Sequence, residues 1–133
     1  MAGVACIDSS GLLKLIVREE ETSALEADLA QREGLIASRL AALECRRAAR
    51  RAANKRVLQA VEQVLEAIYF LEITPAILDR AADLEPPLVR SLEAIHLATA
   101  LSLDDPALEL ITYDARMADA ARASGLRVAQ PGR

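Results

Sequence analysis

The side chains with the greatest potential for chemistry are four carboxylates, those of Asp8, Glu44, Glu93 and Asp114. Asp8 ends the apolar run VACID and Asp114 ends the run LELITYD, so each acid follows a segment typical of a buried strand. Glu44 lies about two turns into a helical region, beside its apolar face, and Glu93 interrupts the apolar run SLEAIHLATAL. The ligand crevice of an open parallel sheet lies beyond the carboxyl ends of its strands. We therefore expect the four acids to converge on one crevice.

Carboxylates gathered in one crevice need a partner of opposite charge. They repel and desolvate one another unless a cation or a proton neutralises them. A ligand set of oxygen atoms, without histidine or cysteine, suits Mg²⁺ or Mn²⁺. Such ions fix a phosphate, activate water and stabilise a leaving oxygen. The four acids together therefore predict phosphodiester hydrolysis.

Each acid taken alone has a simpler structural explanation. Asp8 and Asp114 both precede a helix, where an aspartate commonly caps the N-terminus. Glu44 could be a solvated side chain or an ion-pair partner of Arg47. Glu93 could be an exposed acid of a first helical turn, favoured there by the helix dipole. It is the conjunction of the four acids that favours a metal site.

The segments that must position these acids alternate between strand and helix. Short apolar runs predict strands at residues 4–8, 35–38, 70–74, 108–114 and 126–129. Helical spacing and capping residues predict helices at residues 9–20, 22–32, 39–67, 75–84, 91–101 and 115–125. Parallel neighbours need helical crossovers. We therefore expect an α/β fold with a parallel sheet of about five strands, flanked by helices on both faces, in one domain over residues 1–133.

A few residues mark where the helices begin and end. Ser38 is a typical N-cap, and Thr74 followed by Pro75 is a typical helix start. Asn54 marks a break in the region 39–67, at which the helix either bends or splits. Gly125 is expected to close the last helix.

The composition limits the classes of function. Aromatic residues make up 2% of the 133 residues, which leaves little material for stacking nucleic-acid bases. The formal net charge of −4 argues against binding polyanions through total charge, although local patches can act differently. With no signal-type segment and no apolar run near the ~20 residues of a membrane span, we expect a cytoplasmic protein without membrane contact. Cys6 and Cys45 form no CxxC pattern and are expected to be buried, reduced thiols.

Four stretches of the sequence resemble PIN-domain ribonucleases and, among these, the VapC-type toxins of bacterial toxin–antitoxin pairs. The stretches are IDSSGLLKL, SRLAALECRRA, LVRSLEAIHLATAL and LITYDARMADAARASGLRV. The stretches occur in the expected order, and the match that rests on them covers nearly the whole chain. The resemblance depends on all four stretches, because any one alone is weak.

The resemblance implies a site, a metal and partners. It implies an acidic pocket that holds Mg²⁺ or Mn²⁺ for endonucleolytic cleavage of RNA and consists of Asp8, Glu44, Glu93 and Asp114. Asp8 and Glu93 would be the principal metal ligands. Ser9 and Thr112 would support the pocket by hydrogen bonding, and Asp119 is a weaker candidate for an additional acid. Similar toxins are homodimers and are inhibited by a cognate VapB-like antitoxin.

One position departs from the family pattern, which usually has aspartate where this chain has Glu93. The extra methylene displaces the carboxylate by roughly 1.5 Å, whereas a metal site tolerates about 0.5 Å of misplacement. A glutamate can still reach an ion through a different rotamer. Two alternatives therefore stay open: an active nuclease with altered geometry, or a catalytically impaired PIN-fold protein that binds antitoxin or RNA without cleavage.

The only histidine of the chain, His96, lies one helical turn from Glu93. It could act as a general base or a phosphate contact. The resemblance makes it a usual helix residue of the family rather than a catalytic one. A packing or hydrogen-bonding role is therefore the favoured interpretation.

A run of basic residues follows the second predicted strand. On a helical projection Arg47, Arg51 and Lys55 share a stripe with Glu44, so they could lead an RNA backbone toward the acids. The alternative is a solvated helix face, or ion pairs with the acidic stretch REEE at residues 18–21.

Two other Mg²⁺-dependent folds fit the sequence less well. A receiver domain needs an acceptor aspartate after the third strand and a lysine late in the chain, but this chain has Thr74 there and no lysine beyond Lys55. A phosphatase of the Asp-x-Asp type needs a second aspartate where Ser10 stands.

Overall fold

Helices and strands alternate along the chain, as the sequence predicts. The computed structural model describes residues 3–85 and 87–133. The elements are β1 (Ala5–Ile7), α1 (Ser9–Ile16), α2 (Thr22–Leu29), β2 (Leu35–Ser38), α3 (Arg39–Ala52), α4 (Lys55–Glu66), β3 (Tyr69–Leu71), α5 (Pro75–Ala82), α6 (Ser91–Ser102), β4 (Glu109–Ile111), α7 (Ala115–Ala123) and β5 (Arg127–Ala129).

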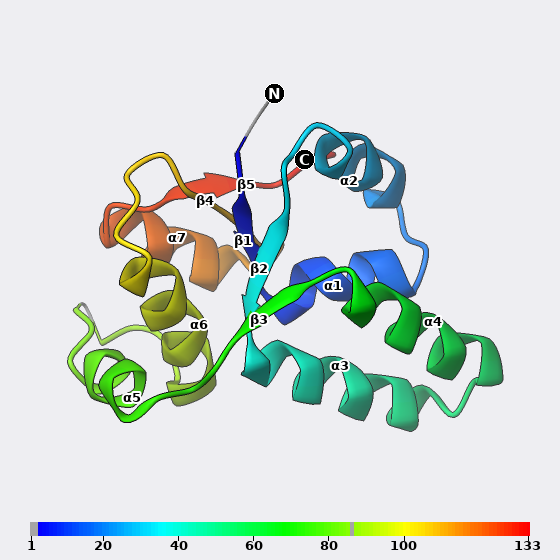
Figure 1. The fold of residues 1–133 in the computed structure, drawn as a ribbon, viewed down its shortest axis with the longest axis horizontal. Helices are drawn as coiled ribbons and strands as arrows, with labels where there is room; N and C mark the ends of the chain where they lie inside the picture. The colour runs from blue at the N-terminus through cyan, green and yellow to red at the C-terminus, as the bar shows by residue number, and fades with distance from the viewer. Residues whose placement is uncertain (1–2, 86) are drawn as a thin grey trace.

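The strands form one parallel sheet in the order β3-β2-β1-β4-β5. The chain builds outward from β1 to β2 and β3, and then returns to the other side of β1 to add β4 and β5 (Figure 1). The direction of winding thus reverses between β1 and β4, which pair in register from Ala5 with Glu109 to Ile7 with Ile111. A reversal of this kind opens a crevice at the carboxyl ends of the two strands.

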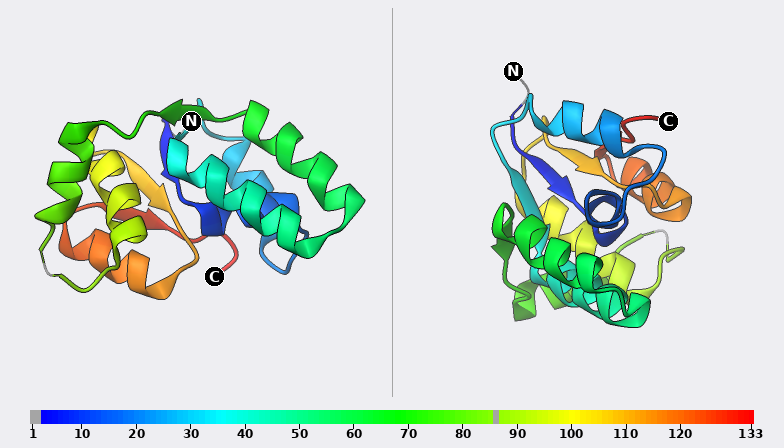
Figure 2. Two further views of the ribbon diagram at one scale, coloured as in Figure 1. Left: turned by 90° about the horizontal axis from the view of Figure 1, so that it is seen from below. Right: turned by 90° about the vertical axis from the view of Figure 1, so that its right-hand side faces the viewer.

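Helices cover both faces of the sheet, so the predicted α/β architecture is confirmed. Along β1 the side chains alternate: Ala5 and Ile7 join the core formed with α1, α2, α3 and α4, while Cys6 joins the core formed with α6 and α7. Helix α5 packs on α6 rather than directly on the sheet. The two groups of helices lie on opposite sides of the strands in Figure 1 and again in the left view of Figure 2.

The predicted helix boundaries are confirmed where a side chain caps the helix. The hydroxyl of Ser38 accepts from the Leu40 amide, and that of Thr74 accepts from the Ile77 amide. The region 39–67 splits rather than bends: Ala53 adopts a left-handed conformation with φ of 51°, and the Asn54 side chain then caps α4.

Several predicted segments were too long, among them α1, which ends at Ile16 instead of residue 20, and β4, which ends at Ile111 instead of residue 114. The third strand is Tyr69–Leu71 instead of 70–74, because it pairs with Ile36–Ser38 and the chain then turns to let Thr74 cap α5. Helix α5 ends at Ala82 instead of residue 84. These shifts leave the sheet order and the placement of the acids unchanged.

Helix α1 lies unusually close to the strand before it. A Cβ atom at Gly11 would lie 2.6 Å from Cγ1 and 2.8 Å from Cδ1 of Ile7, a spacing that only glycine allows. This close approach brings the first turn of α1 directly over the end of β1, where Asp8 is located.

Two expectations about the rest of the chain can be compared with the structure. Cys6 and Cys45 are buried free thiols, as expected. Among the described helices, none has the length and apolar character needed to cross a bilayer.

Candidate active site

Asp8 and Asp114 follow the two strands between which the winding of the sheet reverses. The backbone amide of Asp8 donates to the carbonyl of Ile111 at 3.2 Å, which extends the pairing of β1 and β4 to the first acid. Asp114 lies three residues beyond Ile111, after Thr112 and Tyr113. The fold therefore brings the first acid beside the segment that carries the last.

The carboxylate of Asp8 is only 3% exposed and is held by three donors. Its Oδ1 accepts from the Ser10 hydroxyl at 2.6 Å and from the Gly11 amide at 3.1 Å, and its Oδ2 accepts from the Thr112 hydroxyl. Burial raises the pKa of Asp8, although these hydrogen bonds act in the opposite direction. A buried carboxylate of this kind favours a nearby cation, which would stabilise its charged form.

Thr112 links the two aspartates. Its buried hydroxyl donates to Asp8, accepts from the backbone amide of Asp114 at 3.2 Å, and lies 3.3 Å from the hydroxyl oxygen of Ser10. Asp114 also caps α7, since its Oδ1 accepts from the amides of Arg116 and Met117. The simpler explanation for both aspartates, helix capping, is therefore correct, and it accounts for only part of their acceptor capacity.

Glu44 is held by His96. Nε2 of the buried imidazole lies 2.6 Å from Oε1 of Glu44, so the ring joins α6 to α3. This confirms the hydrogen-bonding role favoured for His96. Burial, and then the charges of Glu44 and Asp8, raise the pKa of the Cys45 thiol to about 12.

Glu93 points back toward the start of its own helix. Its Oε2 accepts from the backbone amide of Arg90 at 3.3 Å, which satisfies one of the free amides at the N-terminus of α6. This contact matches the alternative explanation given for Glu93, that of an acid in a first helical turn.

The predicted cluster of four acids is not preformed. Within residues 3–85 and 87–133, no three histidine, cysteine, aspartate or glutamate side chains are arranged to hold a metal ion. The structure brings Asp8 and Asp114 to the two sides of Thr112, while Glu44 turns to His96 and Glu93 turns to the Arg90 amide. The roles of Glu44 and Glu93 as metal ligands stay predictions.

The support predicted from Ser9 comes instead from its neighbour. Ser10 donates to Asp8 and accepts from the Tyr113 amide at 2.9 Å, whereas Ser9 lies in a surface pocket. No sequence signal separates the two serines, because both lie in the first turn of α1 directly after the Asp8 cap. The weaker candidate Asp119 is 83% exposed and lies 3.7 Å from Arg122.

A surface pocket of about 410 Å³ is lined by one of the four acids. It contains Glu44 together with Arg47 and Arg51 of the predicted basic stripe. Lys55 begins α4 after the break, so the projection that placed it on the stripe does not extend to it. Among the described residues, the ion pairs of the stretch at 18–21 go to Lys14, Glu26 and Arg133 and not to this stripe.

The chain matches the family model described as PIN domain over residues 5–123. It belongs to the PIN-domain family. Ribonuclease VapC35 of Mycobacterium tuberculosis is 42% identical over 130 residues, which cover 95% of this chain and 96% of that protein. Ribonuclease VapC46 of the same organism is 39% identical over 131 residues, which cover 94% and 95% of the two chains. These similarities confirm the VapC-type PIN domain inferred from the four sequence stretches.

A solved structure shares the fold of this PIN domain. It is a chain of a toxin–antitoxin complex from Klebsiella pneumoniae, with a TM-score of 0.69 and 24% sequence identity. The alignment covers 96% of this chain and 97% of that one. The sheet order and the flanking helices are thus those of an established architecture.

The oxygen atoms of this PIN domain fit a hard divalent cation. Among the described residues, no lysine or arginine forms a salt bridge with the buried Asp8 carboxylate. Oδ2 of Asp8 accepts one hydrogen bond and, within the described ranges, Oδ2 of Asp114 accepts none. Each oxygen retains a free lone pair. Carboxylate and hydroxyl oxygens are the ligand types that suit Mg²⁺ and Mn²⁺.

Proposed function

We propose that this protein is a metal-dependent endoribonuclease and the toxin of a toxin–antitoxin pair. The observation that carries the proposal is the buried Asp8 carboxylate, which has no lysine or arginine partner among the described residues and is linked through Thr112 to Asp114. This arrangement lies where the winding of the sheet reverses. The similarity to ribonucleases VapC35 and VapC46 supports RNA as the substrate.

Each residue near the acids has a role in this proposal. Asp8 and Asp114 would hold Mg²⁺ or Mn²⁺, and Glu44 and Glu93 are the further candidate ligands. When bound, the ion would position the RNA phosphate and activate a water for attack on phosphorus. Ser10 and Thr112 orient the Asp8 carboxylate through hydrogen bonds that are already present. His96 on α6 fixes the direction of the Glu44 carboxylate on α3 through their hydrogen bond.

The pocket beside Glu44 suits a polyanionic substrate. Arg47 and Arg51 line it and would contact the RNA backbone, with Lys55 beyond them on α4. Arg46 is engaged instead with Glu62, at 2.9 and 3.0 Å. We expect this part of binding to be sensitive to salt, because it depends on phosphate contacts.

The proposal includes protein partners and a place of action. We propose a VapB-like antitoxin and a second copy of this chain, in line with the toxin–antitoxin complex that shares the fold. Exposed Leu43 and Leu92 both border the pocket and supply apolar surface for a protein contact. A toxin that cleaves cellular RNA acts where that RNA is found, so the proposal implies a cytoplasmic location.

Cleavage of total RNA by the purified protein tests this function. We expect cleavage with Mg²⁺ or Mn²⁺, none with EDTA, and none by the Asp8→Asn variant. Asp79→Asn changes an exposed acid on α5, away from the site, and is the matched control. Sequencing of the new RNA ends would identify the target. Cleavage that persists in EDTA or in Asp8→Asn would contradict the proposal.

The catalytically impaired alternative is tested at Glu93. If the longer side chain has abolished cleavage, Glu93→Asp should create activity that the unchanged protein lacks. If the protein is an active nuclease, Glu93→Asp should preserve or raise its rate, because the shorter carboxylate restores the family pattern. A large loss of activity in Glu93→Asp would contradict the pocket as described.

A further inference from the structure

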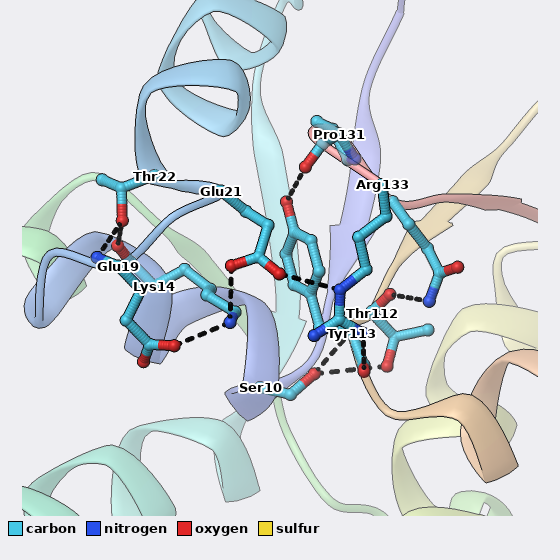
Figure 3. A network of polar contacts seen from close by, with 10 residues as sticks. Ser10, Lys14, Glu19, Glu21, Thr22, Thr112, Tyr113, Pro131 and Arg133 are labelled. Atoms are coloured by element: carbon cyan, nitrogen blue, oxygen red, sulfur yellow. Dashed lines mark hydrogen bonds and ion pairs between the residues drawn. The ribbon is translucent and has the colours of Figure 1, made fainter.

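The segment Gln130–Arg133, here called the tail segment, lies against the residues that follow β4 (Figure 3). Nε2 of Gln130 donates to the carbonyl oxygen of Thr112 at 2.9 Å. A guanidinium N–H of Arg133 donates to the carbonyl oxygen of Tyr113 at 3.0 Å. Two consecutive carbonyl groups between Asp8 and Asp114 are therefore held by side chains of the tail segment.

Residues 112–114, which follow β4, make further contacts with Asp8 and with residues beside it. The Thr112 hydroxyl donates to Asp8, and the amides of Tyr113 and Asp114 donate to the Ser10 and Thr112 hydroxyls. Residues 112–114 are thus held by hydrogen bonds with Asp8 and Ser10 and by hydrogen bonds from the tail segment. No helix or strand includes these residues, so their position depends on such contacts.

Buried and paired charges hold the tail segment in place. Nε of Arg133 donates to Oε2 of Glu21 at 2.8 Å, and Nζ of Lys14 donates to Oε1 of the same carboxylate at 2.9 Å. Glu21 and Lys14 are each only 8% exposed. The two cations lie 5.3 and 5.2 Å from the centre of the Tyr113 ring, which suits cation–π contact.

The backbone of the tail segment is also closely fitted. The Tyr113 hydroxyl donates to the carbonyl oxygen of Pro131 at 2.8 Å. Gly132 has a φ of +91°, and a Cβ atom there would lie 3.1 Å from Cβ of Glu21 and 3.2 Å from Cβ of Ala24. The red end of the ribbon accordingly lies beside α2 in Figure 1. The contact is therefore a specific docking of side chains and backbone.

We infer that the tail segment is a brace for residues 112–114, with Arg133 as a positioning residue for RNA cleavage. A catalytic or metal-binding constellation must be held to about 0.5 Å by contacts from residues behind it. Arg133 supplies such a contact because its planar fork reaches the Glu21 carboxylate and the Tyr113 carbonyl at once. The inference rests on the proposed function, since it concerns the same acids.

Arg133→Ala removes both contacts, and Arg133→Lys keeps the charge but loses the fork. Because small displacements from remote mutations can lower rates by about a hundredfold, we expect Arg133→Ala to lower kcat by roughly tenfold or more. The KM for RNA should stay within about twofold, since binding contacts are left in place. Arg133→Lys should restore little of the rate. Arg122→Ala changes an exposed arginine on α7 and is the control.

A second readout does not depend on nuclease activity. Hydrogen–deuterium exchange of the Tyr113 and Asp114 amides should be faster in Arg133→Ala than in the unchanged protein, while exchange within α3 stays the same. Unchanged exchange at 113 and 114 would overturn the brace even if the protein cleaved no RNA. Faster exchange with an unchanged kcat would overturn the positioning role, because the contact would then be structural only. Absence of cleavage in the unchanged protein would instead count against the proposed function.

Discussion

Nε2 of His96 lies 2.6 Å from Oε1 of Glu44, and this contact joins α6 to α3 beside the acidic site. The imidazole is only 4% exposed, and one of its ring nitrogens is committed to Glu44. The hydrogen bond explains why an apolar helix carries a histidine. It also fixes the direction of a carboxylate that would otherwise be free to rotate toward solvent.

Replacement of His96 by phenylalanine should show how much this hydrogen bond contributes to the unfolding free energy. Phenylalanine fills similar space but leaves a partly buried carboxylate without its partner, at a cost of about 1–3 kcal/mol in unfolding free energy. His96→Gln keeps an amide donor and should lose less. Urea unfolding of the two variants checks the order. Equal stability of His96→Phe and the unchanged protein would show that the hydrogen bond contributes nothing.

Thr112→Val should affect both aspartates. It removes the donor to Asp8 and the acceptor for the Asp114 amide, so we expect a loss of about 1–3 kcal/mol in unfolding free energy and slower RNA cleavage. Thr99→Val is the control, because the buried Thr99 hydroxyl donates only to the Ile95 carbonyl within its own helix. Losses of equal size in the two variants would argue against a special role for Thr112.

Glu21 should make the folding stability of the protein depend on pH in the acid range. Hydrogen bonds from Lys14 and Arg133 lower the pKa of Glu21 from 4.5 to about 2. A carboxyl group with a lowered folded-state pKa stabilises the protein above its unfolded-state pKa, and this contribution disappears as the pH falls from 4.5 to about 2. The unchanged protein should therefore be more stable than Glu21→Gln at pH 7, with a difference that shrinks through that range. Urea unfolding at several pH values measures it, and a constant difference would contradict the assignment.

Much of the fold could be predicted because its signals are local. Ser38, Asn54 and Thr74 cap helices through their own side chains, and Asp8 and Asp114 follow short buried strands. Alternating strands and helices are then enough to predict the parallel sheet. The end of β3 was misplaced because it depends on pairing with β2, which local sequence does not specify.

The details of the site depend on contacts between distant residues, and these were harder to predict. His96 and Glu44 are 52 positions apart, and Ser10 and Thr112 are 102 positions apart. A helical projection gives the face on which Glu93 lies but not its hydrogen-bond partner, the Arg90 amide. It also treated Lys55 as part of one helix, whereas a left-handed Ala53 divides that helix in two.

The basic residues of α3 should determine how RNA binding responds to salt. Each phosphate contact on a single strand contributes about 0.7 to the slope of log affinity against log salt. The double variant Arg47→Ala with Arg51→Ala should therefore lower the slope by up to about 1.4. The control pair Arg122→Ala with Arg127→Ala changes exposed arginines elsewhere. An unchanged slope in the first pair would eliminate the guiding role of α3.

The central claim is that Asp8 holds a divalent cation. In the absence of metal, we expect Asp8→Asn to be at least as stable as the unchanged protein. The substitution removes a buried carboxylate, and burial disfavours the charged form of that group and raises its pKa. The most direct measurement is titration with Mn²⁺, followed through the electron paramagnetic resonance signal of the free ion. We predict Mn²⁺ binding by the unchanged protein and by Asp79→Asn, and binding weakened by about tenfold or more in Asp8→Asn. Equal Mn²⁺ affinity in a folded Asp8→Asn variant would contradict the claim.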